Sequence, residues 1–151
     1  MHASGPHGPT LVALIAGLFA FSWFFTGVAV SRMTGWHRLA QQFPLQGDFP
    51  RERWRFKGAT ARYGSHYNNC LTIGASPAGL YMAMPWLFRV GHPPLFIPWS
   101  ETTIYRAKVL FWNVVRFQFG RETPITFGFR EDLADQIRRA AGPSWPAERL
   151  G

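Results

Sequence analysis

The chain has 151 residues, of which 47% are hydrophobic and 17% aromatic, and it carries a formal net charge of +8. This length suits one domain of ordinary size, and the positive charge favours anionic partners such as lipid headgroups, nucleic acid or an acidic protein face. The single cysteine, Cys70, excludes an intrachain disulfide and a zinc site built from cysteine ligands.

An apolar segment without charges follows a short N-terminal tail, residues 1–10. Residues 11–30 contain no Asp, Glu, Lys or Arg. As a helix that rises about 1.5 Å per residue they extend roughly 30 Å, the thickness of the hydrocarbon core of a bilayer. We therefore predict a transmembrane helix over residues 11–31. A cleaved signal peptide is the alternative, and small residues at 29–31 suit it, but the segment lacks a basic N-terminal region and is longer than a usual signal-peptide core.

The positive charges are distributed unevenly about this segment. No Lys or Arg precedes it, whereas Arg32, Arg38 and several further arginines follow within a short distance. By the positive-inside rule the N-terminus lies outside and the domain lies in the cytoplasm, so the predicted location is the inner (cytoplasmic) membrane, crossed once. Residues 32–50 are predicted to form a juxtamembrane connector, with Trp36 at the membrane interface and helical structure ended by Phe-Pro pairs.

From residue 51 the hydrophobic residues recur with a period of two, which is typical of strands. Trp54 and Phe56 are expected on one face of the first strand. A turn at 76–79, with proline early and glycine late, predicts a hairpin. Residues 109–119 read as one long strand with an apolar face, and residues 125–129 read as a further strand.

The period becomes helical after Arg130. Leu133, Ile137 and Ala141 fall on one stripe, acidic residues lie early and arginines late, and a Gly-Pro pair ends the helix. The predicted fold class is therefore an N-terminal transmembrane helix plus a mainly-β domain closed by a C-terminal α-helix. The predicted boundaries are 51–142 for this domain and 143–151 for a loose tail.

Three features carry a family resemblance: the sequence HPPLFIPWSE at 92–101, the Gly-Leu-Tyr step at 79–81 and the closing helix. In this order, over residues 51–141, they resemble the bacterial membrane-anchored relatives of pleckstrin-homology (PH) and GRAM domains. The resemblance implies six to seven antiparallel strands in a partly open barrel, closed at one end by the terminal helix. A small open sheet with a helix on one face is the alternative.

Basic residues alternate along the first predicted strand, at Arg51, Arg53, Arg55 and Lys57, and Arg62 follows it. These five form the candidate anionic contact, because near anionic lipid each cation contributes on the order of 1 kcal/mol. The resemblance agrees, since PH-like lipid binders hold phosphoinositide headgroups with basic residues around the first hairpin, although the full basic spacing of such sites is absent here. A solvated outer strand face is the alternative. Interleaved aromatic residues also suit single-stranded nucleic acid, which membrane anchoring disfavours.

The proline-rich segment is a second candidate. Pro98 cannot donate to a sheet ladder, which predicts an edge strand, a bulge or a strand start. Trp99 is expected in the core, Glu101 beside a basic or backbone partner, and His92 as a brace of the turn. We predict that these four residues are structural first and form a recognition edge second.

Catalytic chemistry has little support in the sequence. His66 and Cys70 are four residues apart without a third orienting group, His92 lacks metal ligands at useful spacing, and Glu101 lacks a second carboxylate. We expect no catalytic residue, no metal and no cofactor. The predicted function is a non-enzymatic binding or scaffolding module, integral to the lipid bilayer, that contacts a membrane protein partner. Binding of anionic lipid through the basic strand is the alternative, and an enzyme using His66, Cys70 or His92 is a third hypothesis.

Overall fold

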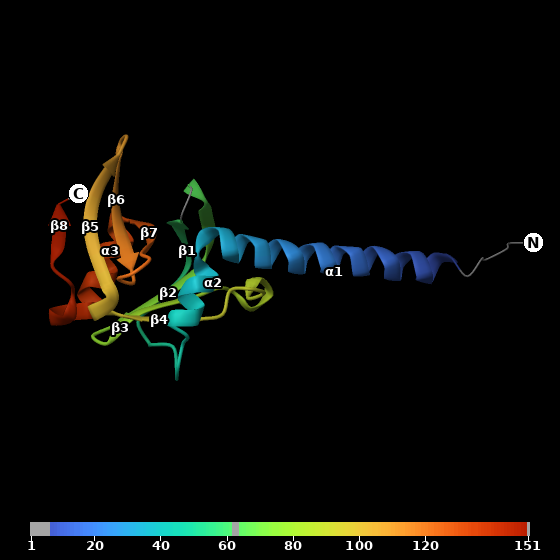
Figure 1. The fold of residues 1–151 in the computed structure, drawn as a ribbon, viewed down its shortest axis with the longest axis horizontal. Coiled ribbons are helices and arrows are strands. Elements are labelled where there is room, and N and C mark those ends of the chain that lie inside the picture. The colour runs from blue at the N-terminus through green and yellow to red at the C-terminus, as the bar shows by residue number, and fades with distance from the viewer. Residues whose placement is uncertain (1–6, 62–63, 151) are drawn as a thin grey trace, which may run out of the picture.

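One long helix projects from a β-rich domain in the computed structural model, which describes residues 7–61 and 64–150 (Figure 1). Helix α1 (His7–Thr34) has 28 residues and carries no charge before Arg32. By length and composition it can cross a membrane, and its most apolar stretch is not buried against the domain. The chain turns at Gly35 into the short helix α2 (Trp36–Gln42), which lies against the domain.

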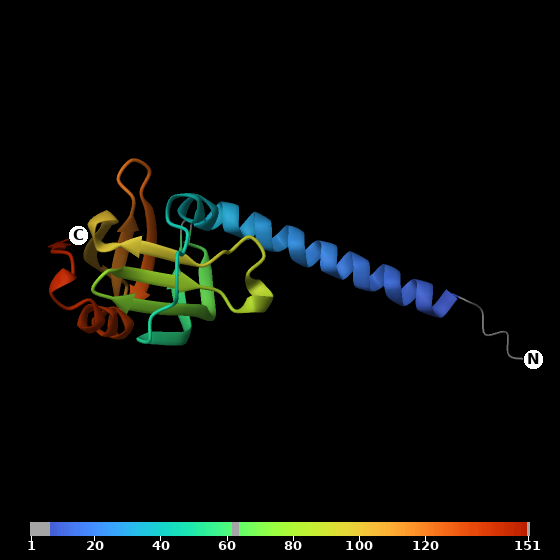
Figure 2. The same ribbon diagram turned by 90° about the horizontal axis from the view of Figure 1, so that it is seen from below.

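Eight strands form one mixed, mostly open sheet in the order β4-β3-β2-β1-β7-β6-β5-β8. Neighbours are antiparallel, except that β8 runs parallel to β5. The two halves of the sheet cross at a steep angle, with the green strands in front of the orange ones in Figure 2. Among the described residues, the pairing of Thr60 with Gly128 joins them. The strands are β1 (Arg53–Thr60), β2 (His66–Ser76), β3 (Gly79–Ala83), β4 (Leu95–Pro98), β5 (Thr102–Val109), β6 (Trp112–Phe119), β7 (Ile125–Arg130) and β8 (Glu148–Leu150).

The core lies between the two halves of the sheet and under helix α3 (Glu131–Ala141). The predicted helical stripe is confirmed, because the apolar side chains of α3 are buried. Phenylalanine rings from β6 and β7 fill the interior beside them, and burial of each ring stabilises the fold by about 1.5–3 kcal/mol. These rings belong to Phe117, Phe119, Phe127 and Phe129. The predicted hairpin at 76–79 is also confirmed, by the pairing of β2 with β3.

The predicted single face of Trp54 and Phe56 is wrong. Strand β1 bulges between Trp54 and Lys57, and Phe56 adopts a φ of 56°. A bulge adds a residue to one strand and re-aims the side chains that follow. The ring of Phe56 therefore points to solvent, while Trp54 is half-buried against the core.

The predicted long strand over residues 109–119 is also wrong. Leu110 and Phe111 form a tight turn between β5 and β6, and Val109 pairs with Trp112 across it. Leu110 takes the positive φ that a two-residue hairpin turn needs, at 55°. Because apolar residues continue through the turn without Gly, Asn or Pro, the sequence contains no signal that separates the two strands.

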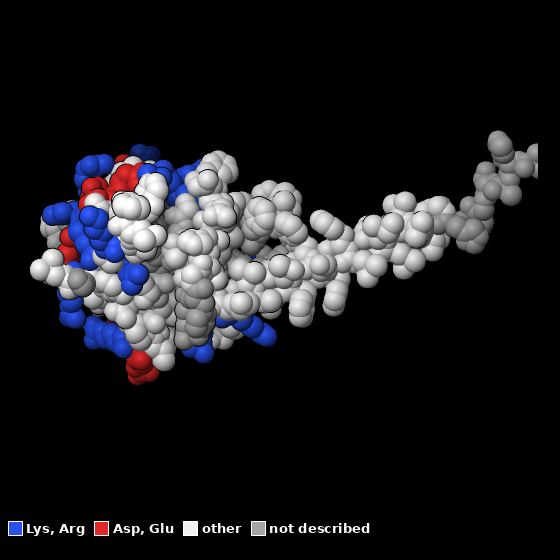
Figure 3. All heavy atoms as spheres, turned by 90° about the horizontal axis from the view of Figure 1, so that it is seen from above, with Lys and Arg blue, Asp and Glu red and all other residues white. Residues whose placement is uncertain are grey.

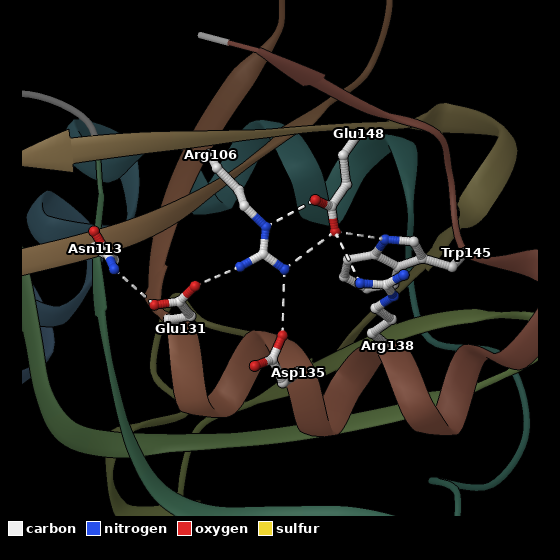
Figure 4. Close-up of polar contacts among 7 residues, drawn as sticks. All are labelled: Arg106, Asn113, Glu131, Asp135, Arg138, Trp145 and Glu148. Carbon is white, nitrogen blue, oxygen red and sulfur yellow. Dashed lines mark hydrogen bonds and ion pairs between the residues drawn. The ribbon is translucent and has the colours of Figure 1, made fainter.

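The C-terminal tail is ordered, contrary to the prediction of a loose tail, by an ionic cluster around Arg106 of β5 (Figure 4). The guanidinium of Arg106 lies 2.7 Å from Glu148 Oε2 on β8. Its other nitrogens contact two carboxylates of α3, Glu131 Oε1 at 2.7 Å and Asp135 Oδ1 at 3.2 Å. Trp145 Nε1 donates to Glu148 Oε1 at 3.1 Å. The cluster holds the tail to both β5 and α3, which adds β8 to the six or seven strands predicted.

The Glu148→Gln substitution is expected to lower the free energy of unfolding by about 1–2 kcal/mol at pH 7, because it removes a partly buried charge-assisted pair. The hydrogen bond from Arg106 lowers the pKa of Glu148 below 4.5. Its stabilisation is therefore present above that pH and is lost as the pH falls through the folded-state pKa. Denaturant unfolding at pH 7 and pH 3 checks this, with Glu122→Gln in an exposed turn as control. Equal loss at both pH values would contradict it.

Candidate functional site

The last turns of α1 pack on the segment between β3 and β4, with two backbones in direct contact. A Cβ added to Gly27 of α1 would lie 2.9 Å from the carbonyl oxygen of Val90. Gly91, at a φ of 72°, approaches α1 equally closely: a Cβ added to Gly91 would lie 3.0 Å from the Cα atom of Val28. Ser31 Oγ donates to the carbonyl of Gly91. Glycine at positions 27 and 91 permits the two backbones to come this close, since a larger residue at either position would clash. The end of α1 is therefore packed firmly on the segment between β3 and β4.

A chain of hydrogen bonds lies beneath this contact. Tyr67 Oη lies 2.7 Å from Thr34 Oγ1 and 3.1 Å from His92 Nε2, and His92 Nδ1 lies 3.1 Å from the carbonyl of Val90. Since a carbonyl only accepts, Nδ1 carries the proton and Nε2 accepts from the Tyr67 hydroxyl. Burial raises the pKa of Tyr67 to about 12 and lowers the pKa of His92. Both groups are therefore neutral at pH 7, and His92 braces the turn as predicted.

The indole of Trp36 completes this junction. It is fully buried, and its Nε1 donates to the carbonyl of Pro93 at 2.9 Å. The ring centroid lies 5.3 Å from that of His92 and 5.9 Å from that of Tyr67. The predicted interfacial position of Trp36 is therefore wrong, because the first residues after α1 belong to the core of the domain.

Acidification is expected to destabilise this junction through His92. Its folded-state pKa is lowered from 6.5, so the unfolded chain binds the proton first as the pH falls below 6.5. Stability should then decrease by up to about 1.4 kcal/mol per pH unit until the folded-state pKa is reached. Tyr67, the titratable group in contact with the ring, stays neutral in this range. The His92→Gln substitution removes the titration, so its melting temperature should vary less than that of the wild-type protein between pH 7 and pH 5. Parallel pH profiles would contradict this.

The residues proposed for catalysis occupy separate environments. His66 begins β2 and contacts Thr60 Oγ1 at 3.3 Å through Nδ1, whereas His92 contacts Tyr67. Burial raises the pKa of the Cys70 thiol, which lowers its thiolate fraction at neutral pH and disfavours a nucleophilic role. Within residues 7–61 and 64–150, no three His, Cys, Asp or Glu side chains form a group that could hold a metal ion.

The predicted basic strand contributes two arginines to a hollow of about 480 Å³ beside the junction. Arg53 and Arg55 line it from β1, and Arg89 lines it from the segment after β3. The exposed rings of Phe56 and Trp86 also belong to its walls. We call this site, whose lining includes these five residues, the basic hollow. The outer face of β2 and β3 forms part of its floor, through Thr72 and Ala83.

The geometry of the basic hollow suits an anionic, phosphate-containing group. Guanidinium groups bind phosphate oxygens with paired N–H donors, and three arginines line this hollow. Arg89 is also held in place, because its Nε donates to the carbonyl of Met84 at 3.1 Å. Phe56 keeps its left-handed backbone conformation at the edge of the hollow. Such backbone strain costs on the order of 1 kcal/mol in a bulky residue and is typical of functional sites.

The structure does not place the other predicted cations, Arg51, Lys57 and Arg62, in the lining of the basic hollow. Arg51 is exposed and is not among the residues that line the hollow, and Lys57 is half-buried opposite Leu71 because of the bulge. Arg62 lies outside the described residues. Arg89 and Trp86 were not among the predicted site residues. The available signal was the sequence Trp-Leu-Phe-Arg at 86–89, which places an arginine beside large apolar residues in a proline-bounded segment.

The proline-rich segment has the structural role predicted for it. Strand β4 is the edge of the sheet and ends at Pro98. Trp99 is buried and donates from Nε1 to the carbonyl of Ser76 at 2.8 Å. Glu101 Oε1 lies 3.5 Å from Arg121 Nε. The recognition role of this edge stays a prediction.

No family model matches this chain, and no curated protein matches it. We therefore infer its function from the basic hollow and from the junction with α1.

Proposed function

We propose that this chain is a non-enzymatic binding module with a PH-like domain, anchored in a membrane by α1 and holding anionic lipid headgroups in the basic hollow. The serial order of seven antiparallel strands, β1 to β7, followed by α3 supports the PH-like assignment. The length of α1 and the lack of charged residues before Arg32 support the anchor. In Figure 3 the Lys and Arg side chains gather on the domain, and the exposed length of α1 shows none.

The observation that carries the proposal is that Arg53, Arg55 and Arg89 line one hollow. Arg89 belongs to the segment that packs on α1, so the hollow lies next to the membrane surface if α1 crosses the bilayer. Arginines near an anionic leaflet each contribute on the order of 1 kcal/mol. The Lys and Arg residues follow the apolar part of α1, which favours the domain on the cytoplasmic side of the membrane.

Lipid selectivity of the full-length chain in bilayers tests the headgroup proposal. The protein is reconstituted in phosphatidylcholine with small amounts of spin-labelled phosphatidylglycerol or spin-labelled phosphatidylcholine. We expect a larger protein-associated fraction for phosphatidylglycerol, and a preference that weakens at high salt because screening shortens to about 3 Å at 1 M. Equal association of the two lipids would contradict headgroup binding and leave the anchor unaffected.

The orientation is tested separately. Protease digestion of right-side-out and inside-out vesicles is expected to cleave the domain only when the cytoplasmic face is accessible. Cleavage in right-side-out vesicles alone would reverse the proposed orientation.

A protein partner is the second candidate, and the tip of the β5–β6 hairpin favours it. Leu110 and Phe111 are 81% and 92% exposed, beside the exposed Trp112. The tip projects away from the line of α1 (Figure 1), so the bilayer that holds α1 does not cover it. Exposed apolar patches of this kind mark protein interfaces. A partner that co-purifies in mild detergent with the wild-type chain, and is lost with Leu110→Ser and Phe111→Ser, supports this role. Retention by the double variant would contradict it.

A further inference from the structure

The contacts of α1 conflict with a transmembrane span that ends at Val30. The 3₁₀ turn η2 (Trp86–Phe88) packs on α1 at Trp23: the indole Nε1 donates to the carbonyl of Leu87 at 3.2 Å, and its ring lies 5.2 Å from that of Phe88. Trp23 precedes Val30 by seven residues, or about 10 Å along a helix. If Val30 marked the edge of the hydrocarbon, η2 would lie about 10 Å inside it.

We propose that the η2 loop, residues 85–91, is immersed in the interfacial layer of the bilayer, and that the lipid-surrounded part of α1 ends near residues 23–26. This inference rests on the proposed transmembrane role of α1. The span then begins before Leu11, within the candidate span that starts at Gly8: residues 8–26 contain no Asp, Glu, Lys or Arg and extend roughly 28 Å as a helix, close to the thickness that a span needs. The exposed surface of the η2 loop thus contacts lipid, at the boundary between acyl chains and headgroups.

The exposed side chains of the η2 loop suit this position. Trp86, Leu87 and Phe88 are 79%, 48% and 40% exposed, and they adjoin the exposed apolar surface of α1 at Trp23. Tryptophan is favoured at the membrane interface, where its ring lies in an apolar layer and its N–H stays near water. Removing these side chains from water contributes about 25 cal/mol for each Å² of apolar surface buried.

Six of the seven backbone carbonyls of the η2 loop accept hydrogen bonds within the fold, which lowers the cost of placing them in a layer poor in water. Within the loop, Phe88 N donates to Pro85 O at 2.8 Å, and Arg89 N donates to Trp86 O at 3.3 Å. Groups outside the loop donate to four more of its carbonyls: Trp23 Nε1 to Leu87 O, His92 N to Arg89 O, His92 Nδ1 to Val90 O, and Ser31 Oγ to Gly91 O. Pro85 has no amide N–H to satisfy. Immersion therefore leaves few loop carbonyls without a hydrogen-bond partner.

The position of Arg89, the charged residue of the loop, also agrees with immersion. Arg89 lines the basic hollow and donates to the carbonyl of Met84, while the rings of Trp86 and Phe88 are exposed. Long basic side chains at membrane surfaces keep their charge at headgroup level while apolar neighbours enter the hydrocarbon. The apolar tip and the basic hollow therefore match the two layers of one leaflet.

Spin-label accessibility in the full-length chain tests this arrangement. In a Cys70→Ser background, single labels are attached through Trp86→Cys, Leu18→Cys in mid-α1, or Phe111→Cys on the hairpin tip. Each is reconstituted in phosphatidylcholine–phosphatidylglycerol vesicles. Collision rates with oxygen, which concentrates in lipid, are compared with those of a water-soluble nickel chelate. We expect an oxygen-to-nickel ratio several-fold higher at positions 86 and 18 than at position 111.

The possible results distinguish a failure of loop immersion from a failure of the proposed transmembrane span. A lipid-like ratio at position 18 with an aqueous ratio at position 86 would overturn loop immersion and leave the span in place. An aqueous ratio at position 18 would overturn the span, and the inference with it. Because Trp86 is largely exposed, its replacement removes little packing. A second label through Leu87→Cys must report the same layer, and an aqueous ratio at either position, 86 or 87, would reject the inference.

Discussion

The Trp36→Ala substitution is expected to lower the free energy of unfolding of the domain by about 3–5 kcal/mol. Trp36 has no exposed surface, and the substitution leaves a cavity among the rings of Tyr67, His92 and Phe127. It also leaves the carbonyl of Pro93 without its indole donor. A loss of this size is a large part of the stability of a small domain, so the folded yield should fall as well.

Denaturant unfolding of the full-length chain in detergent micelles measures this effect. Trp112→Ala is the matched control, because its indole is exposed on the hairpin tip and its removal is expected to cost less than about 0.5 kcal/mol. Trp99→Ala, also buried, should destabilise the domain by a similar amount to Trp36→Ala. Equal unfolding midpoints for Trp36→Ala and Trp112→Ala would show that Trp36 does not hold the core together.

These two tryptophans also show what the sequence can and cannot predict. Trp99 follows Pro98 at the end of an apolar run, and that pattern correctly predicts a buried ring beside an edge strand. Trp36 follows a membrane-like helix, and that pattern favours an interfacial ring. Its burial depends on the turn at Gly35, which returns α2 to the domain and is a tertiary feature without a local signature.

Periodic patterns predict elements well where burial is one-sided. The apolar stripe of α3 and the β2–β3 hairpin were predictable for this reason. The pattern fails at Phe56 and at Leu110, where apolar side chains in a left-handed conformation point to solvent. β8 was also unpredictable, because Glu148 is held by an arginine 42 residues earlier in the chain.

The basic hollow was only half predictable. Arg53 and Arg55 belong to an alternating run that is visible in the sequence, whereas Arg89 joins them from a segment more than 30 residues away. The bulge at Phe56 turns the predicted row of cations into a cluster with aromatic walls. A sequence pattern describes one strand, and the site is made by the approach of two segments.

Removal of the three arginines of the hollow, by Arg53→Gln, Arg55→Gln and Arg89→Gln together, is expected to weaken the preference for anionic over zwitterionic lipid. At about 1 kcal/mol for each arginine near the surface, the loss reaches up to about 3 kcal/mol, on the order of a hundredfold in the ratio of association constants. Spin-labelled phosphatidylglycerol and phosphatidylcholine around the reconstituted chain measure this ratio. The remaining salt dependence should also be weaker than that of the wild-type protein.

A variant with the same change of net charge separates the hollow from general electrostatics. Arg121→Gln, Arg130→Gln and Arg149→Gln remove three exposed arginines that do not line the hollow. If attraction by the whole domain sets the lipid preference, both triple variants lose it equally, and the hollow is not a headgroup site. If the hollow binds the headgroup, only the first variant loses the preference, while the melting temperatures of both stay near that of the wild-type protein. The arginines of the hollow would then act through their position, as three donors beside an aromatic wall, and not through their charge alone.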